Sequence, residues 1–258
     1  MFRYREQVHA KLKLPVPGKV GRIKRYHLAR TDRLILFPYA PQDNGASGLL
    51  PEKVLKAKCP LTWAYLSDNK HYLENREDGR MRGPGWYGFI YPKALDVMPL
   101  PKIFTPDIAS QSSFSLDVTG DAFFTGGVAG GYGILVLPGY SREYVLGLLN
   151  SKLLEWFIRQ TATPMRGGYY SYESRFIRHL PIHTIDSADH RDKARHDKVV
   201  TLVERMLELN KKKHSGKLAP SEVDRIEREI AATDQEIDQL VYQLYEITDE
   251  EQAIIEGG

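Results

Sequence analysis

The sequence predicts an α+β fold, in which a mixed α/β globular domain with a twisted sheet is followed by an antiparallel helical hairpin. Two observations predict it. Short apolar segments bounded by glycine, proline or aspartate recur through the first 190 residues, as strands between turns do. Beyond that point, apolar side chains recur at helical spacing in two long segments joined by a short turn. We therefore expect one domain at 1–190 and a helical hairpin at 191–258.

The elements of the first domain follow from these segments. Strands are expected at residues 33–39, 102–108, 113–118, 122–126 and 132–137. Helices are expected at 51–75 and 141–160, and Ser141 is the predicted N-cap of the second helix. Residues 76–100 are expected to form a loop, because glycine and proline interrupt every periodic pattern there.

The hairpin is expected to begin with an amphipathic helix at 192–213. A second helix is expected from Ser221, a good N-cap residue. Its apolar positions alternate in steps of three and four, which is coiled-coil spacing, at Val223, Ile226, Ile230, Thr233, Ile237, Leu240 and Leu244. Thr248 and Glu251 then form a capping-box pattern that opens a last short helix ending at Gly257.

Composition places the chain among globular proteins that can bury a sizeable core. It has 258 residues, 42% of them apolar and 27% charged. Cys59 is the only cysteine, which excludes an internal disulfide and a cysteine-based zinc site and favours a reducing compartment. Because no leader pattern and no membrane-length apolar run is visible, we expect a cytoplasmic protein.

The charge is distributed unevenly along the chain. Residues 1–33 carry ten lysines and arginines against two acidic residues, whereas residues 221–258 carry twelve acidic residues against two arginines. A basic head predicts a polyanionic partner, and the acidic tail is expected to face away from that partner or to dock on a basic protein surface.

Patterns for catalysis are weak or absent in the sequence. The motifs of amino-methyltransferases are missing, and "TGGVAGGYG" (125–133) precedes a predicted strand instead of linking a strand to a helix, so a turn or bulge is expected there. Glu52, Asp68 and Lys70 match a Mg²⁺-nuclease pattern only loosely, with Asp107 as a further carboxylate. We therefore predict no catalytic residue, no metal ligand and no cofactor in this chain.

What recurs is arginine or lysine beside aromatic rings on segments rich in glycine or proline. Arginine suits guanine edges and phosphates, and tyrosine and tryptophan add flat contacts with a hydrogen-bonding tip. Because loops can carry such groups into a groove, these segments favour duplex DNA as the partner. The predicted DNA-binding residues are Arg22, Lys24, Arg25, Tyr26, Arg80, Arg82, Trp86, Tyr87, Arg166, Tyr169, Tyr170 and Tyr172.

Several blocks, taken together, resemble the C-terminal specificity domain of TaqI-like adenine methyltransferases and of the related single-chain restriction–modification enzymes. They are "GRIKRYHL" (21–28), "PEKVLKAKCPLTWAYLSDNKHYLENRE" (51–77), "WYGFIYPKALD" (86–96), "KIFTPDIA" (102–109), "FFTGGVAGGYGI" (123–134) and "YVLGLLNSKLLEWFIRQTATPMRGGYYSYESRFIRHLPI" (144–182). The ending at 232–257 also resembles the terminus of that family.

The resemblance implies a DNA target recognition domain whose sequence choice serves an adenine-N6 methyltransferase. In that family the methyl group comes from S-adenosylmethionine, bound by a catalytic domain that has no counterpart here, so the chain is expected to be a fragment, a split subunit or a decayed gene. The partners implied are double-stranded DNA and a methyltransferase catalytic domain or subunit, with the helical hairpin as spacer or dock. The segment "LPVPGKVGRIKRYHL" (14–28) departs from the family pattern just before its basic block.

Two other interpretations stay open at this point. In one, the chain is a protein-docking or dimerisation module that has lost DNA binding, and the hairpin forms a homodimer. In the other, an unrecognised Mg²⁺ nuclease uses Glu52. Salt-sensitive duplex binding separates the first interpretation from DNA recognition, and strand cleavage that disappears in Glu52→Ala identifies the second.

Overall fold

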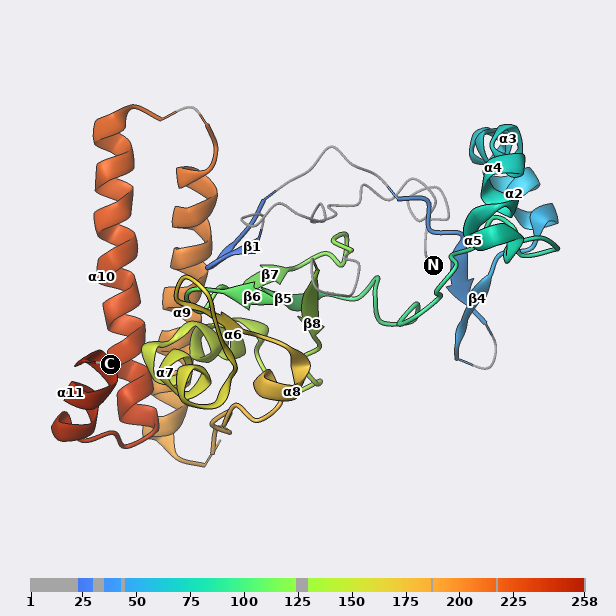
Figure 1. The fold of residues 1–258 in the computed structure, drawn as a ribbon. Helices are drawn as coiled ribbons and strands as arrows, with labels where there is room; N and C mark the ends of the chain where they lie inside the picture. The colour runs from blue at the N-terminus through green and yellow to red at the C-terminus, as the bar shows by residue number, and fades with distance from the viewer. Residues whose placement is uncertain are drawn as a thin grey trace. The chain divides into compact units, whose positions relative to one another are not determined.

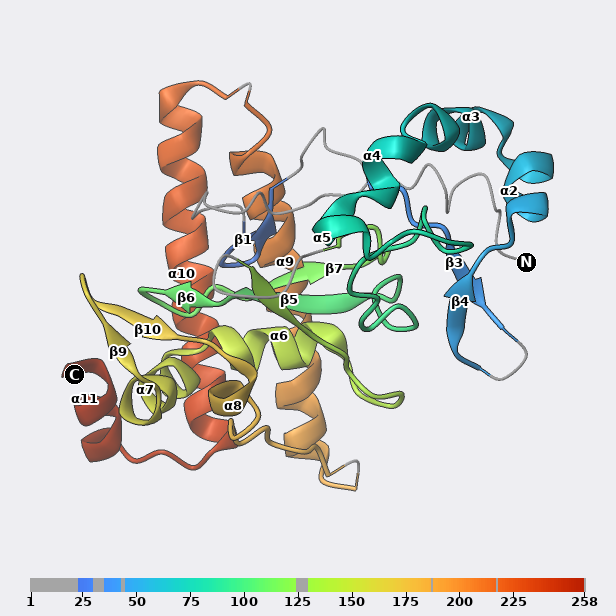
Figure 2. The ribbon, with the colours of Figure 1, turned by 45° about the vertical axis from the view of Figure 1, so that its right-hand side comes forward.

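The computed structural model describes residues 23–29, 35–42, 45–123, 130–186, 188–216 and 218–257. These residues form two compact units. We call unit 1 the described residues of 35–100 and 119–123, and unit 2 those of 23–29, 101–118 and 130–257. Figures 1 and 2 show the elements of both units. The predicted DNA-binding residue Arg22 and the larger part of the glycine-rich segment 125–133 lie outside the described residues.

Unit 1 is a small β-hairpin with a group of short helices. Strands β3 and β4 pair antiparallel, and helices α2 to α5 follow them along the chain. The bounds are β3 Tyr39–Pro41, β4 Ser47–Leu49, α2 Glu52–Lys58, α3 Pro60–Asp68, α4 Lys70–Glu74 and α5 Arg76–Gly79. Two small apolar clusters hold the unit together, one around Leu55 and Trp86 and the other around Phe37 and Phe123.

The helix expected at 51–75 is instead divided into α2, α3 and α4. Cys59 separates the first two with φ −139° and ψ 59°, which is not helical. The reason is Pro60, whose ring disfavours helical backbone in the residue before it but suits the first position of the next helix. The strand expected at 33–39 begins later than its apolar run indicates, because residues 35–38 are irregular and β3 starts at Tyr39.

Unit 2 combines small antiparallel sheets with the longest helices. One sheet has the order β7-β5-β8, a second has the order β6-β10-β9, and β1 pairs with β2. The strand bounds are β1 Ile23–Lys24, β2 His27–Leu28, β5 Lys102–Pro106, β6 Ile108–Ala109, β7 Ser115–Asp117, β8 Gly131–Ile134, β9 Pro164–Met165 and β10 Tyr169–Ser171. The strands expected at 102–108, 113–118 and 132–137 therefore exist in shorter form; at 122–126, residues 122–123 are irregular and the rest lies outside the described residues.

The helices of unit 2 surround one apolar core. Their bounds are α6 Arg142–Asn150, α7 Lys152–Thr161, α8 Ser174–Ile177, α9 His190–Lys213, α10 Pro220–Leu244 and α11 Asp249–Gly257. Helices α9 and α10 lie side by side as an antiparallel hairpin, and α6 and α7 pack against them (Figures 1 and 2). This confirms the predicted α+β class with a helical hairpin. The hairpin shares its core with α6 and the sheet, through residues such as Leu148, Val203 and Ile237.

The predicted helix ends are confirmed in part. Ser141 accepts a hydrogen bond from the Tyr144 amide and caps α6. Thr248 and Glu251 form the capping box ahead of α11, with Thr248 N donating to Glu251 Oε2 at 2.9 Å. The N-cap prediction at Ser221 is wrong: α10 begins one residue earlier with Pro220, and Ala219 occupies the N-cap without a side-chain bond.

The helix expected at 141–160 is divided at Ser151. Its backbone is extended, with ψ 154°, and its hydroxyl accepts from the Leu154 amide to start α7. In the part of the chain that the structure describes, no helix is both long enough and apolar enough to cross a bilayer.

Candidate nucleic-acid interface

The turn between β9 and β10 presents Arg166 to solvent. Pairing of the two strands leaves Arg166, Gly167 and Gly168 as the connection. Both glycines have positive φ, 80° and 77°, a conformation that is costly for residues with a Cβ. Arg166 is exposed and makes no hydrogen bond or ion pair with any residue that the structure describes. Its five N–H groups are therefore available to acceptors on a ligand.

Tyr169 and Tyr170, which follow this turn on β10, are half-buried. Arg159 lies over the Tyr170 ring with its guanidinium carbon 5.5 Å from the ring centroid, a cation–π contact. The Arg159 guanidinium itself donates to Glu155 Oε1 at 2.8 Å and to the Ser110 carbonyl at 3.2 Å. The Tyr170 ring is thus supported from below by the last turn of α7.

Tyr172, the third tyrosine of the segment, packs inside unit 2. Its exposed fraction is 1%, and its ring meets Phe114 edge-on at 5.8 Å. The Tyr172 hydroxyl lies 3.5 Å from Ser112 Oγ, and burial raises its pKa to about 12. Because Tyr172 is buried, it has a packing role. Its contact with DNA stays a prediction, and the buried position does not favour that contact.

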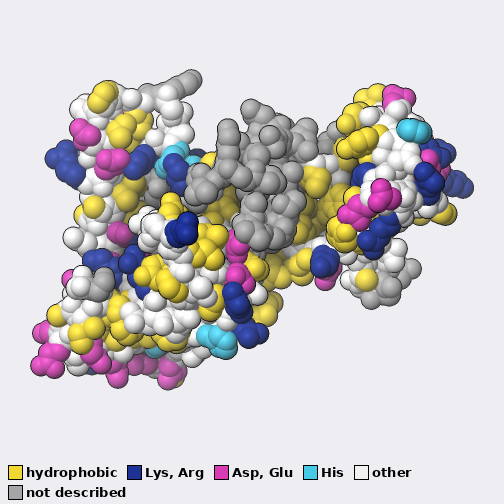
Figure 3. Space-filling model, viewed as in Figure 1, with side chains coloured by type: hydrophobic (Ala, Val, Ile, Leu, Met, Phe, Trp, Pro, Cys, Tyr) yellow, Lys and Arg dark blue, Asp and Glu magenta, His cyan; other side chains and the backbone are white. Residues whose placement is uncertain are grey.

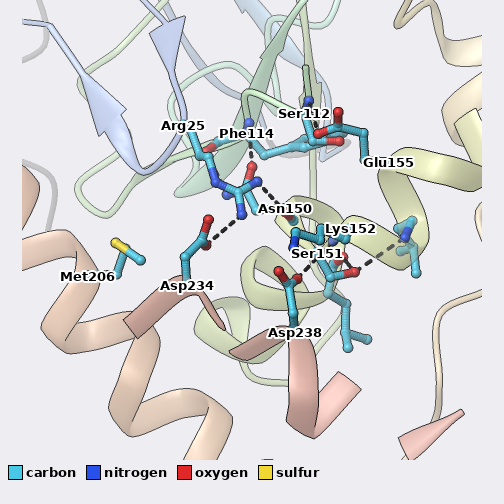
Figure 4. A network of polar contacts seen from close by, with 12 residues as sticks. Arg25, Ser112, Phe114, Asn150, Ser151, Lys152, Glu155, Met206, Asp234 and Asp238 are labelled. Atoms are coloured by element: carbon cyan, nitrogen blue, oxygen red, sulfur yellow. Dashed lines mark hydrogen bonds and ion pairs between the residues drawn. The ribbon is translucent and has the colours of Figure 1, made fainter. Parts of the chain in front are cut away.

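A network of polar contacts anchors α7, the helix below the turn (Figure 4). The Asn150 side chain bonds both the amide and the carbonyl of Phe114, each at 3.0 Å, and so ties the α6–α7 junction to the segment before β7. Glu155 accepts from the Ser112 amide at 2.9 Å. At the start of α7, Asp238 of α10 accepts from the Lys152 amide at 2.9 Å. The segment before β7, α7 and the helical hairpin are therefore linked through hydrogen bonds.

The β1–β2 turn is held against the same network by Arg25. Its guanidinium donates to Asp234 Oδ1 at 2.6 Å and to the Asn150 carbonyl. Tyr26 follows with φ 55° and an exposed fraction of 2%, and burial raises its pKa. Arg25 and Tyr26 thus have structural contacts within unit 2. Lys24, in contrast, is exposed.

In unit 1, Trp86 and Tyr87 face inward. Their rings pack edge-on against Trp63 at centroid distances of 5.7 and 5.6 Å. The Tyr87 hydroxyl donates to the Leu50 carbonyl at 2.7 Å. Arg76 donates to the carbonyls of Trp86 and Gly88, both at 2.9 Å, and so fixes the ends of the loop. A packing role accounts for both rings, and their contact with DNA stays a prediction.

Arg80 and Arg82 lie on the outside of this loop. Arg80 forms an ion pair with Glu77 at 3.5 Å, and Arg82 donates to Asn75 Oδ1 at 2.6 Å. Glu77 and its neighbour Asp78 both have positive φ, 46° and 57°, which is uncommon for residues with side chains. Both arginines are exposed, but each is already held by a side chain of its own loop.

The carboxylates of the nuclease interpretation lie on separate elements. Glu52, Asp68 and Lys70 belong to three different helices of unit 1, and Glu52 and Lys70 pair within their own helices. Asp107 lies between β5 and β6 in unit 2, where burial raises its pKa. Among the described residues, no group of three or more histidine, cysteine, aspartate or glutamate side chains is arranged to hold a metal ion.

Sequence reasoning missed the residues that support the candidate interface. Arg159 and Asp238 are ordinary helix-surface types whose partners are distant in sequence, with Asp238 86 positions from Lys152. His27 and His214, which contact each other and Lys24, also carried no motif. The one signal in the sequence was that His27 is the last residue of the basic block "KRYH" (24–27).

Comparison with known proteins identifies the family of this chain and one relative. The profile of the TaqI-like C-terminal specificity domain matches residues 22–182, more than half of the chain. The type II restriction enzyme and methyltransferase RM.Eco57I of Escherichia coli is 27% identical over 205 residues, which cover 76% of this chain and 20% of that protein. The chain thus spans about a fifth of the length of this relative. The chain belongs to the TaqI-like C-terminal specificity domain family.

Proposed function

We propose that this chain recognises a specific sequence in duplex DNA on behalf of a restriction–modification system, with adenine-N6 methylation carried out elsewhere. Two findings support it. The chain belongs to a family described as specificity domains, and its relative is named as a restriction enzyme and methyltransferase. The segment that exposes Arg166 is the turn between two strands of a small sheet, an arrangement in which a loop reaches a groove from a stable scaffold.

The observation that carries the proposal is the Arg166 turn. An antiparallel two-stranded ribbon is narrow enough to enter the major groove of B-DNA. Arginine at its tip can donate two parallel hydrogen bonds to O6 and N7 of guanine, the commonest specific contact. Because Arg166 makes no hydrogen bond or ion pair to a described residue, it gives up no such contact there when it binds a base. Tyr169 and Tyr170 add half-exposed rings beside it.

The helical hairpin is the proposed dock for a methyltransferase catalytic domain or subunit, which would bind S-adenosylmethionine. Its apolar stripe is already buried in the core of unit 2, so docking would use the outer, charged face. Figure 3 shows acidic side chains gathered over α11. These charges suit a basic protein surface and would repel DNA phosphates. A functional boundary near residue 190 is part of this proposal.

The proposal is tested by fluorescence anisotropy with a labelled, sequence-randomised duplex at low and at physiological salt. Affinity is expected to fall steeply with salt, because each phosphate contact releases counterions. Duplexes selected by binding then supply a preferred sequence. Against that sequence, Arg166→Ala is expected to cost about 1–3 kcal/mol and to relax the choice of one base pair. Arg82→Ala tests the loop of unit 1 in the same assay.

The matched control is Arg191→Ala, which removes an exposed arginine from the first turn of α9. It is expected to leave the affinity unchanged. Failure of the wild-type chain to bind any duplex at low salt would contradict the proposal and favour the docking interpretation. Equal losses in Arg166→Ala and Arg191→Ala would mean that only general charge is sensed.

A further inference from the structure

Two histidines from distant parts of unit 2 stack face to face. His27 on β2 and His214 at the C-cap of α9 have ring centroids 3.8 Å apart and planes inclined by 8°. Lys24 Nζ on β1 lies 3.5 Å from His214 Nε2. His214 Nδ1 lies 2.8 Å from the Asn210 carbonyl oxygen. Three basic side chains thus meet where the β1–β2 turn touches the end of α9.

These contacts indicate which ring nitrogen of His214 carries the hydrogen. A carbonyl oxygen can only accept, so Nδ1 carries the hydrogen and donates to Asn210. An ammonium can only donate, so Nε2 offers its lone pair to Lys24. Lys24 is exposed and uses one of its three N–H groups on His214, which leaves two for another acceptor.

The surroundings of the pair are basic. Burial, together with the charges of His214 and Lys24, lowers the pKa of His27 to about 4. Two acidic side chains of the neighbouring helix α10 are engaged in other ion pairs: Asp234 pairs with Arg25 at 2.6 Å, and Glu227 pairs with Lys213 at 2.8 Å.

In the described strands packed against β1 and β2, the charged side chains pair with each other. Strands β5 and β7 pack against β1 and β2 and contribute Lys102 and Asp117, which pair with each other at 3.0 Å in the interior. The last turn of α9 adds further lysines, among them the exposed Lys212. An anion placed at Lys24 would therefore meet basic groups from β1, β2 and α9.

We propose that Lys24, His27 and His214 form a binding site for one phosphate group of the DNA backbone, and that the stacked pair takes up a proton when the phosphate binds. Lys24 donates directly to a phosphate oxygen. The phosphate supplies the negative charge that the cluster lacks, so an imidazole nitrogen gains a proton from solvent and becomes a second cationic donor. No covalent bond between heavy atoms forms or breaks. The proposal rests on the proposed function only in taking DNA as the source of the phosphate.

The first test measures duplex affinity between pH 5.0 and 7.5 at constant ionic strength. Binding that takes up one proton strengthens by about tenfold for each unit of falling pH, between the pKa of the free group and that of the bound group. The double substitution His27→Gln with His214→Gln is expected to flatten this dependence. Lys24→Gln is expected to weaken binding and to reduce the slope of log affinity against log salt by about one.

Two controls separate the site from general effects of pH and from misfolding. His190→Gln removes a histidine from the opposite end of α9 and is expected to keep the wild-type pH dependence. His27→Phe keeps a flat ring for stacking but cannot gain a proton, so it too is expected to flatten the dependence. Equal pH dependence in the wild type, in His27→Phe and in the double variant would overturn the proposal.

A second measurement does not require DNA. The NMR signals of the imidazole carbons are titrated against pH with and without dimethyl phosphate, a diester with one fixed charge, and with inorganic phosphate. Both are expected to raise the pKa of His27 in the wild type and not in Lys24→Gln. If the histidines respond to phosphate but no duplex binds, the site stands and the proposed function falls. If duplex binds with no response of the histidines and no pH dependence, the function stands and the site falls.

Discussion

The Trp86 loop of unit 1 and the Arg166 turn of unit 2 are composed of the same kinds of residue and use them in opposite ways. Both combine arginine, glycine and aromatic rings in a short segment. In unit 1 the rings of Trp86 and Tyr87 are buried and form part of an apolar cluster. In unit 2 Tyr169 and Tyr170 are half-exposed, and Arg166 extends from the tip. The pattern predicts a surface turn but not the direction of its rings.

The difference arises from the scaffold of each segment. Trp86 follows a group of short helices and packs against Trp63 of α3, which offers an apolar ring at a centroid distance of 5.7 Å. The Arg166 turn instead joins two strands, where successive side chains point to opposite faces. Tyr170 of that ribbon rests on Arg159 of α7, whereas Pro164 and Met165 of β9 are exposed. A pattern of arginine with aromatic residues therefore indicates a contact surface mainly where a ribbon, and not a helix group, carries it.

The largest expected effect that would sharpen this comparison is that of Trp86→Ala. Trp86 is buried in unit 1, and its indole nitrogen makes no hydrogen bond in the described structure, so the substitution removes packing contacts and a cation–π contact with Lys70. We expect unit 1 to lose about 3–5 kcal/mol of unfolding free energy. The measurement is urea unfolding followed by Trp63 fluorescence in a Trp156→Phe background, since these three are the only tryptophans of the chain.

Tyr169→Ala is the matched substitution in the turn of unit 2. Because its ring is only half-buried, we expect a loss of less than about 1.5 kcal/mol, which falls in the range of ordinary substitutions. Similar losses in the two variants would break the comparison, since they would assign the same packing role to both rings.

The next largest effect concerns pH and is expected in unit 2 alone. Burial raises the pKa of Asp238 to about 6, from an ordinary value near 4. The folded state then keeps a proton that the unfolded chain has released, so this group's contribution to stability is present below about pH 4 and is lost as pH rises to about 6. Two pKa units correspond to about 3 kcal/mol. Asp238→Asn removes the charge and keeps an acceptor for the Lys152 amide.

We therefore expect Asp238→Asn to be more stable than the wild type at pH 7.5, by up to about 3 kcal/mol, with the difference shrinking toward pH 4. Urea unfolding of unit 2 is followed by fluorescence of Trp156. Asp224→Asn, on the exposed face of the same helix, serves as control and is expected to change little at either pH. A variant that is less stable than the wild type at pH 7.5 would mean that the ionised carboxylate is needed beside Arg25.

The sequence predicted most of those elements whose position depends on local side-chain chemistry. Helical periodicity placed α9 and α10, and capping chemistry placed the starts of α6 and α11. It failed where one residue interrupts a pattern that otherwise continues. Pro60 and Ser151 each divide a helix that apolar spacing alone would extend.

The candidate site was predictable only in its exposed parts. Arg82 and Arg166, each followed by a glycine with positive φ, are at the surface, as residues of loops commonly are. The inward rings of Trp86 and Tyr172 could not be predicted, because burial depends on partners from other elements. The contact of Arg25 with Asp234 joins residues 209 positions apart, and no local pattern encodes such a pairing.

The smallest expected effect compares two glycines with the same backbone conformation. Gly168 in the Arg166 turn has φ 77°, Gly45 in the β3–β4 turn has φ 79°, and a Cβ added to either would have no heavy atom within 4 Å. Alanine at either position therefore costs backbone energy alone, about 1–2 kcal/mol of unit stability. Only Gly168→Ala is expected also to weaken duplex binding, by a few-fold, because it alters the path of the chain that presents Arg166. Thermal unfolding and duplex anisotropy of both variants check this, and an equal effect of Gly45→Ala on binding would show that the turn of unit 2 has no special part in the DNA contact.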